Sequence, residues 1–413
     1  MTSQATVERK QAARRTPLGN GIGTESGPSA RLGALDGLRG VAALVVVLHH
    51  LLLMAGPELR RLNGSGVGSV FWWLSQTPLK LLTAGSEAVL LFFVLSGLVV
   101  ALPGLKSGRF SWIGFLSGRV VRLYVPVWAS IAIATAFVWF LPRNSSAVTP
   151  GSWMATSQAT TTGWDRFFSQ VSLTRVSYDV NNVLWSLRWE LVFSVLLPLF
   201  VALAIIVGRY WAVALASAWL LSTVGILTNV DALRYLPVFF IGTLFAVRLE
   251  EIREWSRRRL LGPHPRRNGA ALVIGSLGLL IGHWLLLGVV PAGSLGNTLL
   301  RQLSVLGSAG VLLAAVGVPV VRRALESRIV QWFGLISFSL YLVHVPIIAT
   351  LTFIFGDQLW WLVASIAFPV AIVVAWGFHR IVERPSQRLA RFVSREVAAR
   401  VESHRGGLAR STD

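Results

Sequence analysis

Arg39 and His50 lie within the first long apolar segment of the chain, residues 33–54. Ionisable side chains inside a membrane-length apolar segment are costly and usually functional. Eleven residues separate the two, which on an α-helix is three turns plus about 20° and a rise of roughly 16 Å. They therefore share one helix face at different depths, while His49 points about 80° away from Arg39. This spacing favours a site over the alternative of a buried histidine that only satisfies a core hydrogen bond.

Glu190 is the second candidate for chemistry, because it lies a few residues into the fourth apolar segment, 184–207. His50 and Glu190 are both expected within a turn or two of the outer membrane interface, where they could meet. A carboxylate beside an imidazole orients the ring and supports its protonated form, as a general base requires. We expect His50 to be the base and Glu190 to orient it. The alternative is a structural ion pair of Glu190 with Arg188 or Arg234.

Two arginines stand three residues apart at the start of the third apolar segment, 119–141. One helical turn separates Arg119 from Arg122, so both guanidinium groups can hold one phosphate-bearing ligand. Arg39, near the cytoplasmic start of its own helix, can join them. The alternative is that Arg119 and Arg122 are ordinary membrane anchors on the cytoplasmic side.

The amino-acid composition indicates which kind of structural element positions these side chains. Of 413 residues, 54% are hydrophobic and only 14% charged, which indicates a polytopic membrane protein. We predict an all-α fold with about ten transmembrane helices in one bundle. The ten apolar segments are 33–54, 79–102, 119–141, 184–207, 211–228, 233–249, 269–291, 296–321, 332–355 and 359–381.

The basic residues predict the topology. With the N-terminus inside, 28 of the 38 Lys and Arg residues fall on the cytoplasmic side, nine fall outside and Arg39 lies within the first helix. This is the asymmetry of the positive-inside rule. We therefore predict a multi-pass protein of the cell membrane with both termini cytoplasmic. The net charge of +20 then reflects topology, and no nucleic-acid partner is expected.

The remaining segments complete the domain prediction. Residues 1–32 are expected to be a disordered basic cytoplasmic tail, 33–385 the transmembrane domain and 386–413 a second basic cytoplasmic tail. The outer connection, about 142–183, either covers an outward-facing pocket or is a plain solvated loop. Zero cysteines exclude disulfides, thiolate metal sites and a cysteine nucleophile.

Taken together, six blocks in this order resemble the acyltransferase-3 family of integral-membrane acyltransferases, from about Leu35 to Pro385. Each block alone is a weak signal, but six in the same order on the same predicted helices are a strong one. The blocks are LDGLRG at 35–40 with His50, FFVLSG at 92–97, the pair Arg119 and Arg122, WSL at 185–187 with Glu190 and Pro198, GLISFSLYLVH at 334–344, and ERP at 383–385.

Two positions depart from the family pattern. Leu90 stands where the second-helix motif usually carries an Asp, with Glu87 three residues earlier, and Ser194 stands where an aromatic residue is common. Whether Glu87 substitutes for the Asp is open. Glu87 and His344 are candidates for lining a channel, although a hydrogen bond between packed helices is an equal alternative for His344.

The resemblance implies transfer of an acyl group, most often acetyl, from acyl-CoA to a hydroxyl group of a sugar-containing acceptor. That acceptor is a cell-envelope glycan, a lipid-linked sugar or a glycosylated metabolite such as a macrolide. We expect the phosphates of cytoplasmic acyl-CoA at Arg39, Arg119 and Arg122, and a polar tunnel from there to His50. Transient acylation of His50 is the rival to base catalysis, and no metal is required.

Two other classes of function remain open. A proton-coupled membrane transporter also needs intramembrane Arg, His and Glu residues. The two halves of the chain show no similarity and no matched pair of interrupted helices, which disfavours a transporter. A non-catalytic membrane scaffold would tolerate substitution of His50.

Overall fold

The computed structural model describes residues 28–106, 110–173 and 178–410, and these residues form helices and loops without a β-strand. The predicted tail 1–32 lies almost entirely outside the described residues. The long helices are α2 (Pro28–Asn63), α4 (Gly85–Lys106), α5 (Trp112–Phe140), α8 (Leu184–Val207), α9 (Trp211–Leu227), α10 (Asp231–Val247), α12 (Pro265–Leu285), α13 (Leu295–Gly317), α15 (Arg328–Phe355), α16 (Trp360–Phe378) and α17 (Arg384–Arg410). The prediction of an all-α polytopic membrane protein is confirmed.

Shorter helices connect the long ones. They are α3 (Val70–Gln76), α6 (Trp153–Ser157), α7 (Trp164–Val171), α11 (Leu249–Leu260), α14 (Pro319–Leu325), and the 3₁₀ turns Pro78–Thr83, Ser145–Ala147, Gly208–Tyr210 and Asp357–Leu359. A five-residue π-helix, His379–Glu383, joins α16 to α17.

Each of the ten predicted apolar segments overlaps one of the long helices. By length and composition, eight helical segments of the described residues could cross a membrane, or nine if the bent pair α10 and α11 is one span. The count is below ten because α8 and α9 are joined through a 3₁₀ turn into one helical stretch, Leu184–Leu227. At 44 residues this stretch is about 66 Å long, roughly twice the hydrocarbon thickness of a bilayer. The stretch is therefore long enough to cross a membrane twice.

Helices α2 and α15 run side by side in the bundle, with Gly40 against Gly334 and His50 against His344. Gly40 and Gly334 allow this contact, because a Cβ on Gly40 would overlap the backbone of Gly334 and a Cβ on Gly334 would overlap the backbone of Asp36. Small residues let membrane helices approach this closely. The close approach brings the polar face of α2, with Arg39 and His50, against the buried face of α15.

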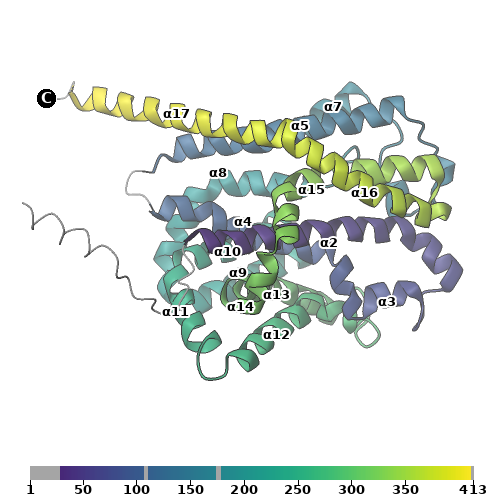
Figure 1. Ribbon diagram of the computed structural model, residues 1–413, viewed down its shortest axis with the longest axis horizontal. Coiled ribbons are helices and arrows are strands. Elements are labelled where there is room, and N and C mark those ends of the chain that lie inside the picture. The colour runs from purple at the N-terminus through teal and green to yellow at the C-terminus, as the bar shows by residue number, and fades with distance from the viewer. Residues whose placement is uncertain (1–27, 107–109, 174–177, 411–413) are drawn as a thin grey trace, which may run out of the picture.

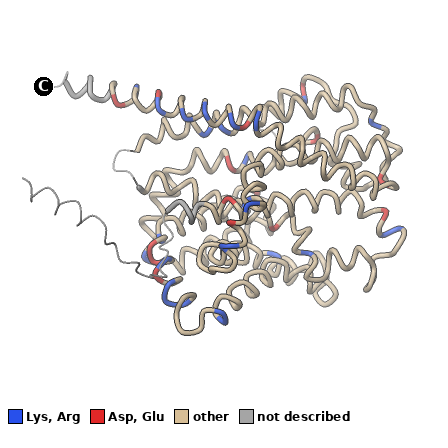
Figure 2. The backbone as a smooth tube through the Cα atoms, viewed as in Figure 1, with Lys and Arg blue, Asp and Glu red and all other residues tan. Residues whose placement is uncertain are grey.

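Helix α17 continues from the bundle and runs along the first turns of α5 (Figure 1). It packs there through Gly114 and Gly118 of α5, which face Ser394 and Ala390 of α17. The predicted tail 386–413 is thus helical over its described part. Figure 2 shows Lys and Arg along α17 and around α11, towards the same end of the molecule. The assignment of that end to the cytoplasm stays a prediction.

The outer connection packs against the bundle. The hydroxyl of Tyr124 donates to the Ser172 carbonyl at 2.9 Å, and the amide of fully buried Asn181 donates to the Leu342 carbonyl at 2.9 Å. Irregular backbone is tolerated at membrane depth where protein buries it. Helix α8 therefore begins beside the middle of α15.

Arg143 ties the same connection to α15. Its guanidinium donates to the Ala159 carbonyl at 2.6 Å and to the Thr350 hydroxyl at 3.1 Å, and it lies over the Phe353 ring. Burial lowers the pKa of Arg143 to about 10, so the group remains charged at neutral pH.

Candidate active site

A cavity of about 510 Å³ lies between α2, α4, α5, α8 and α15, with the start of α17 closing one side. Its volume falls in the usual range of small-molecule sites, about 300–1,000 Å³. The ionisable side chains among its lining residues are Asp36, Arg39, Arg119, Arg122, Glu190, Tyr341 and Glu383. The sequence prediction named four of these, and the structure brings those four together.

Arg119 and Glu190 form an ion pair in the wall of this cavity, with Nη2 of the guanidinium 2.8 Å from Oε1 of the carboxylate. Nε of Arg119 donates to the hydroxyl of Ser194 at 2.9 Å. The hydroxyl of Ser96 donates to the same carboxylate oxygen at 3.3 Å. Both charged side chains are largely shielded, with 13% of Arg119 and 25% of Glu190 exposed. The departure at Ser194 thus supplies a hydrogen-bond partner for Arg119.

The predicted hydrogen bond between the His50 ring and the Glu190 carboxylate is wrong. In the described part of the chain no hydrogen bond or ion pair joins a carboxylate to His50, and Glu190 pairs with Arg119 instead. The prediction misplaced the depth of Glu190 in the bundle. Because the outer connection packs into the bundle, α8 starts deeper than it would after an exposed loop, and Glu190 lies at the level of Arg119.

Arg39, Arg119 and Arg122 form one positively charged side of the cavity, which we call the basic wall. Arg39 is paired with Asp36 at 3.4 Å and is 26% exposed, whereas Arg122 is exposed and has no ion pair or hydrogen bond in the structure as described. The charges of Arg39, Arg119 and Arg122 act on one another electrostatically. Arg122 is therefore the cation of this wall that remains available to an incoming anion.

Glu383 lines the same cavity just before the start of α17. The Ser339 hydroxyl donates to Oε2 at 2.6 Å, His379 Nδ1 lies 3.0 Å from the same oxygen, and Gln387 donates to Oε1 at 2.9 Å. The π-helical turn at His379–Glu383 aims this carboxylate inward, as such turns often do at functional sites. Sequence periodicity gives no signal for a π-helical turn, so only the ERP motif pointed to Glu383.

His50 belongs to a second group of side chains. Its Nδ1 lies 2.9 Å from the Val46 carbonyl and 3.1 Å from Nε2 of His344, and its ring centroid is 5.1 Å from that of Trp153. Trp153 belongs to α6, so the outer connection covers His50 rather than standing clear of the bundle. His50 keeps partial exposure, whereas His344 is fully buried.

Tyr341 stands between the two groups. It lines the cavity, its hydroxyl is 2.6 Å from that of Ser186, and its ring centroid is 6.0 Å from that of His344. The cavity lining does not include His50, so the expected tunnel from the arginines to His50 is not one continuous cavity here. Tyr341 and Ser186 were not predicted as site residues, although both belong to the motif blocks of the sequence.

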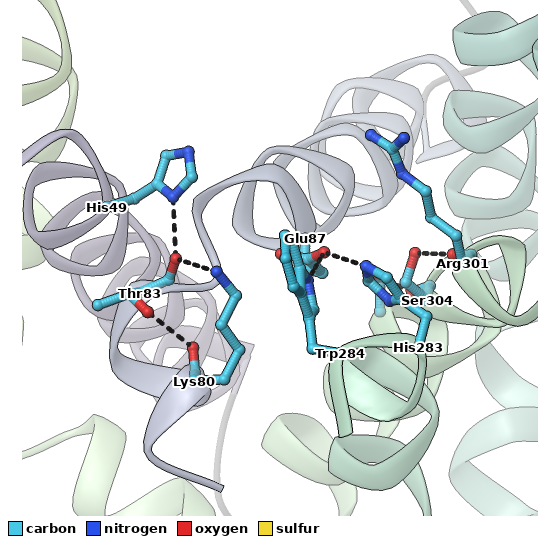
Figure 3. Close-up of polar contacts among 9 residues, drawn as sticks. His49, Lys80, Thr83, Glu87, His283, Trp284, Arg301 and Ser304 are labelled. Atoms are coloured by element: carbon cyan, nitrogen blue, oxygen red, sulfur yellow. Dashed lines mark hydrogen bonds and ion pairs between the residues drawn. The ribbon is translucent and has the colours of Figure 1, made fainter. Parts of the chain in front are cut away.

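Glu87 does not line the cavity. Figure 3 shows it in a separate polar cluster, where its Oε1 accepts from Trp284 Nε1 at 3.0 Å and lies 3.5 Å from His283 Nε2. A neighbouring group joins this cluster through Lys80, whose Nζ lies 4.0 Å over the Trp284 ring. There the Thr83 carbonyl accepts from Lys80 at 3.2 Å and lies 2.9 Å from Nδ1 of His49 on α2. His49 and His50 thus have different neighbours, as their helical positions predict.

No group of three or more His, Asp or Glu side chains in the described residues is arranged to hold a metal ion. The chemistry that this arrangement supports is binding of an anionic ligand at the basic wall and proton transfer at His50.

Comparison with known proteins gives two matches. The sequence model of the acyltransferase-3 family, described as an acyltransferase domain, matches residues 32–380. An O-acetyltransferase, PaAT-1 of Phomopsis amygdali, is 27% identical over 383 residues, with 78% of this chain and 73% of that protein covered. No solved structure matches.

Proposed function

Because the chain belongs to the acyltransferase-3 family and is a multi-pass membrane acyltransferase, we propose that it transfers an acetyl group from acetyl-CoA to a hydroxyl group of a sugar-containing acceptor. The family match over residues 32–380 supports acyl transfer, and the relative's name supports O-acetylation. The acceptor class is a cell-envelope glycan, a lipid-linked sugar or a glycosylated metabolite.

The basic wall supports an acyl-CoA donor. Coenzyme A carries phosphates, and guanidinium groups bind phosphate through charge-assisted, often bidentate hydrogen bonds. Arg122 offers its guanidinium unpaired and Arg39 is only loosely paired. Arg119 is already held by Glu190 and Ser194, so its part is to present the remaining Nη1 to the ligand from a fixed position.

His50 supplies the proton transfer. It removes the proton of the acceptor hydroxyl as that oxygen attacks the thioester carbonyl, the carbon–sulfur bond breaks, and the departing thiolate takes the proton back from His50. Protons balance over the cycle, and the free products are coenzyme A and the ester. Partial exposure of His50 beneath Trp153 supports acceptor entry from the side of the outer connection.

The two substrates approach from opposite sides in this proposal. Arg39 and His50 are eleven residues apart on α2, a rise of roughly 16 Å. The acyl arm passes Tyr341 to span this distance, and rotation of that side chain away from Ser186 opens the way. With both termini in the cytoplasm of a cell-membrane protein, the basic wall faces the donor and His50 the acceptor.

The single observation that carries the proposal is that α2 bears Arg39 of the basic wall and, eleven residues later, the partly exposed His50 beyond the cavity. The test is label transfer by the purified protein in sealed, oriented proteoliposomes. Radiolabelled acetyl-CoA added on the side of α11 and α17 should yield labelled ester with lipid-linked sugars or methyl glycosides supplied on the other side. Absence of label in every acceptor and an intact thioester would contradict the proposal.

A further inference from the structure

The side chain that hydrogen-bonds to His50 is His344, from the motif block of α15. Its Nδ1 lies 2.9 Å from the Leu340 carbonyl, one turn earlier in the same helix. A carbonyl oxygen only accepts, so Nδ1 of His344 carries a proton. In the neutral imidazole, Nε2 of His344 is then an acceptor.

The same reasoning fixes the tautomer of His50. Its Nδ1 lies 2.9 Å from the Val46 carbonyl, so this nitrogen is also protonated. The 3.1 Å contact from His50 Nδ1 to His344 Nε2 joins a donor to an acceptor. One N–H of His50 is therefore shared between a backbone carbonyl and a second imidazole. Nε2 of His50 is left without a proton and without a protein partner among the described residues.

We propose that His344 is a positioning residue that holds His50 in the tautomer whose bare Nε2 is the reacting atom, in place of the expected carboxylate. This inference rests on the proposed function of His50 and adds to it. When His50 takes the hydroxyl proton at Nε2, its ring becomes positively charged. The hydrogen bond from its Nδ1–H to Nε2 of His344 stabilises that charge. Because His344 is fully buried, water cannot provide that acceptor.

The pairing also explains why Glu190 can lie elsewhere. A second imidazole orients the first ring, and it does so without a fixed negative charge beside His50. Gly40 and Gly334 supply the geometry, because the close approach of α2 to α15 is what brings the two rings to a centroid distance of 4.9 Å.

Two substitutions at position 344 separate positioning from packing. His344→Gln keeps an acceptor near the place of Nε2, whereas His344→Leu keeps volume and removes it. Release of coenzyme A from acetyl-CoA is followed with a thiol reagent, with water and methyl glucoside as acceptors. The chain has no cysteine, so the protein adds no thiol background. His283→Leu, which removes another buried histidine, is the control.

We expect His344→Leu to lower kcat by about ten- to a hundredfold with KM for acetyl-CoA unchanged, and His344→Gln to retain kcat within several-fold. His344→Leu with unchanged kcat would overturn the proposal. Nitrogen-15 NMR of histidine-labelled protein provides an activity-independent test. It should show His50 protonated at Nδ1 and bare at Nε2, and a proton on Nε2 instead would also overturn it. Failure of the wild type to cleave acetyl-CoA would count against the proposed function, while the NMR result would still decide the pairing.

Discussion

Arg119 of α5 and Glu190 of α8 form an ion pair at 2.8 Å inside the bundle, although their helices enter it from opposite ends. The outer connection determines where α8 begins and so how deep Glu190 lies. The ion pair therefore makes the position of Arg119 in the basic wall depend on how that connection packs. It also gives the arginine a fixed orientation before any ligand binds.

The ion pair predicts strong coupling between the two positions. Glu190→Ala leaves a largely buried guanidinium with a lost charge-assisted bond, so we expect a loss of about 1.5–3 kcal/mol in the free energy of unfolding. Arg119→Met combined with Glu190→Ala should cost less than the sum of the single changes. Denaturation of the purified single and double variants measures this, and strictly additive losses would show that the pair does not couple.

Donor affinity should depend on Arg122. Arg122→Ala removes the unpaired cation of the wall, and we expect coenzyme A binding to weaken by about 1.5–3 kcal/mol if one charge-assisted bond is lost. Arg122→Lys should restore part of the affinity, since a point charge does not reproduce the guanidinium fork. Titration calorimetry measures both, with exposed Arg257→Ala on α11 as the control. Equal affinity in the wild type and Arg122→Ala would place the phosphates elsewhere.

The contact between α2 and α15 should not tolerate a side chain. Gly334→Ala forces a methyl group into the backbone of Asp36, and we expect a loss of about 1–3 kcal/mol in stability as the helices separate. Gly275→Ala on α12 meets nothing within 4 Å, so it should be neutral or stabilise by up to about 1 kcal/mol. Thermal melting of the two variants in the same detergent compares them. A higher melting temperature for Gly334→Ala than for the wild type would contradict the packing argument.

Helix positions were predictable from the sequence because hydropathy is a local property of about twenty residues. The partners of Glu190 were not, because its depth depends on how residues 142–183 pack through contacts such as Asn181 to Leu342. Arg39, Arg119 and Arg122 were expected at one site, whereas Glu190 was placed with His50 nearer the other side of the membrane and instead pairs with Arg119. The facing of His50 and His344 required the three-dimensional approach of α2 and α15, which no periodicity in either helix encodes.

Trp153 should affect the acceptor and not the donor. It lies against His50 from the outer connection, so Trp153→Ala should raise KM for a methyl glucoside acceptor several-fold and leave KM for acetyl-CoA unchanged. Steady-state kinetics with each substrate varied in turn gives both constants. Trp164→Ala, which removes an exposed tryptophan of α7, is the matched control. A rise confined to the KM for acetyl-CoA would mean that the donor, not the acceptor, approaches beneath Trp153.

The most direct test of the central claim compares neighbouring histidines in one assay. His50 faces His344 and Trp153, whereas His49 contacts the Thr83 carbonyl in the separate polar cluster. The measurement is the rate of coenzyme A release from acetyl-CoA by purified wild type, His49→Ala and His50→Ala, each checked for folding by thermal melting. We predict that His49→Ala keeps much of the wild-type rate and that His50→Ala loses at least about a hundredfold. Release by folded His50→Ala at the wild-type rate would contradict the account.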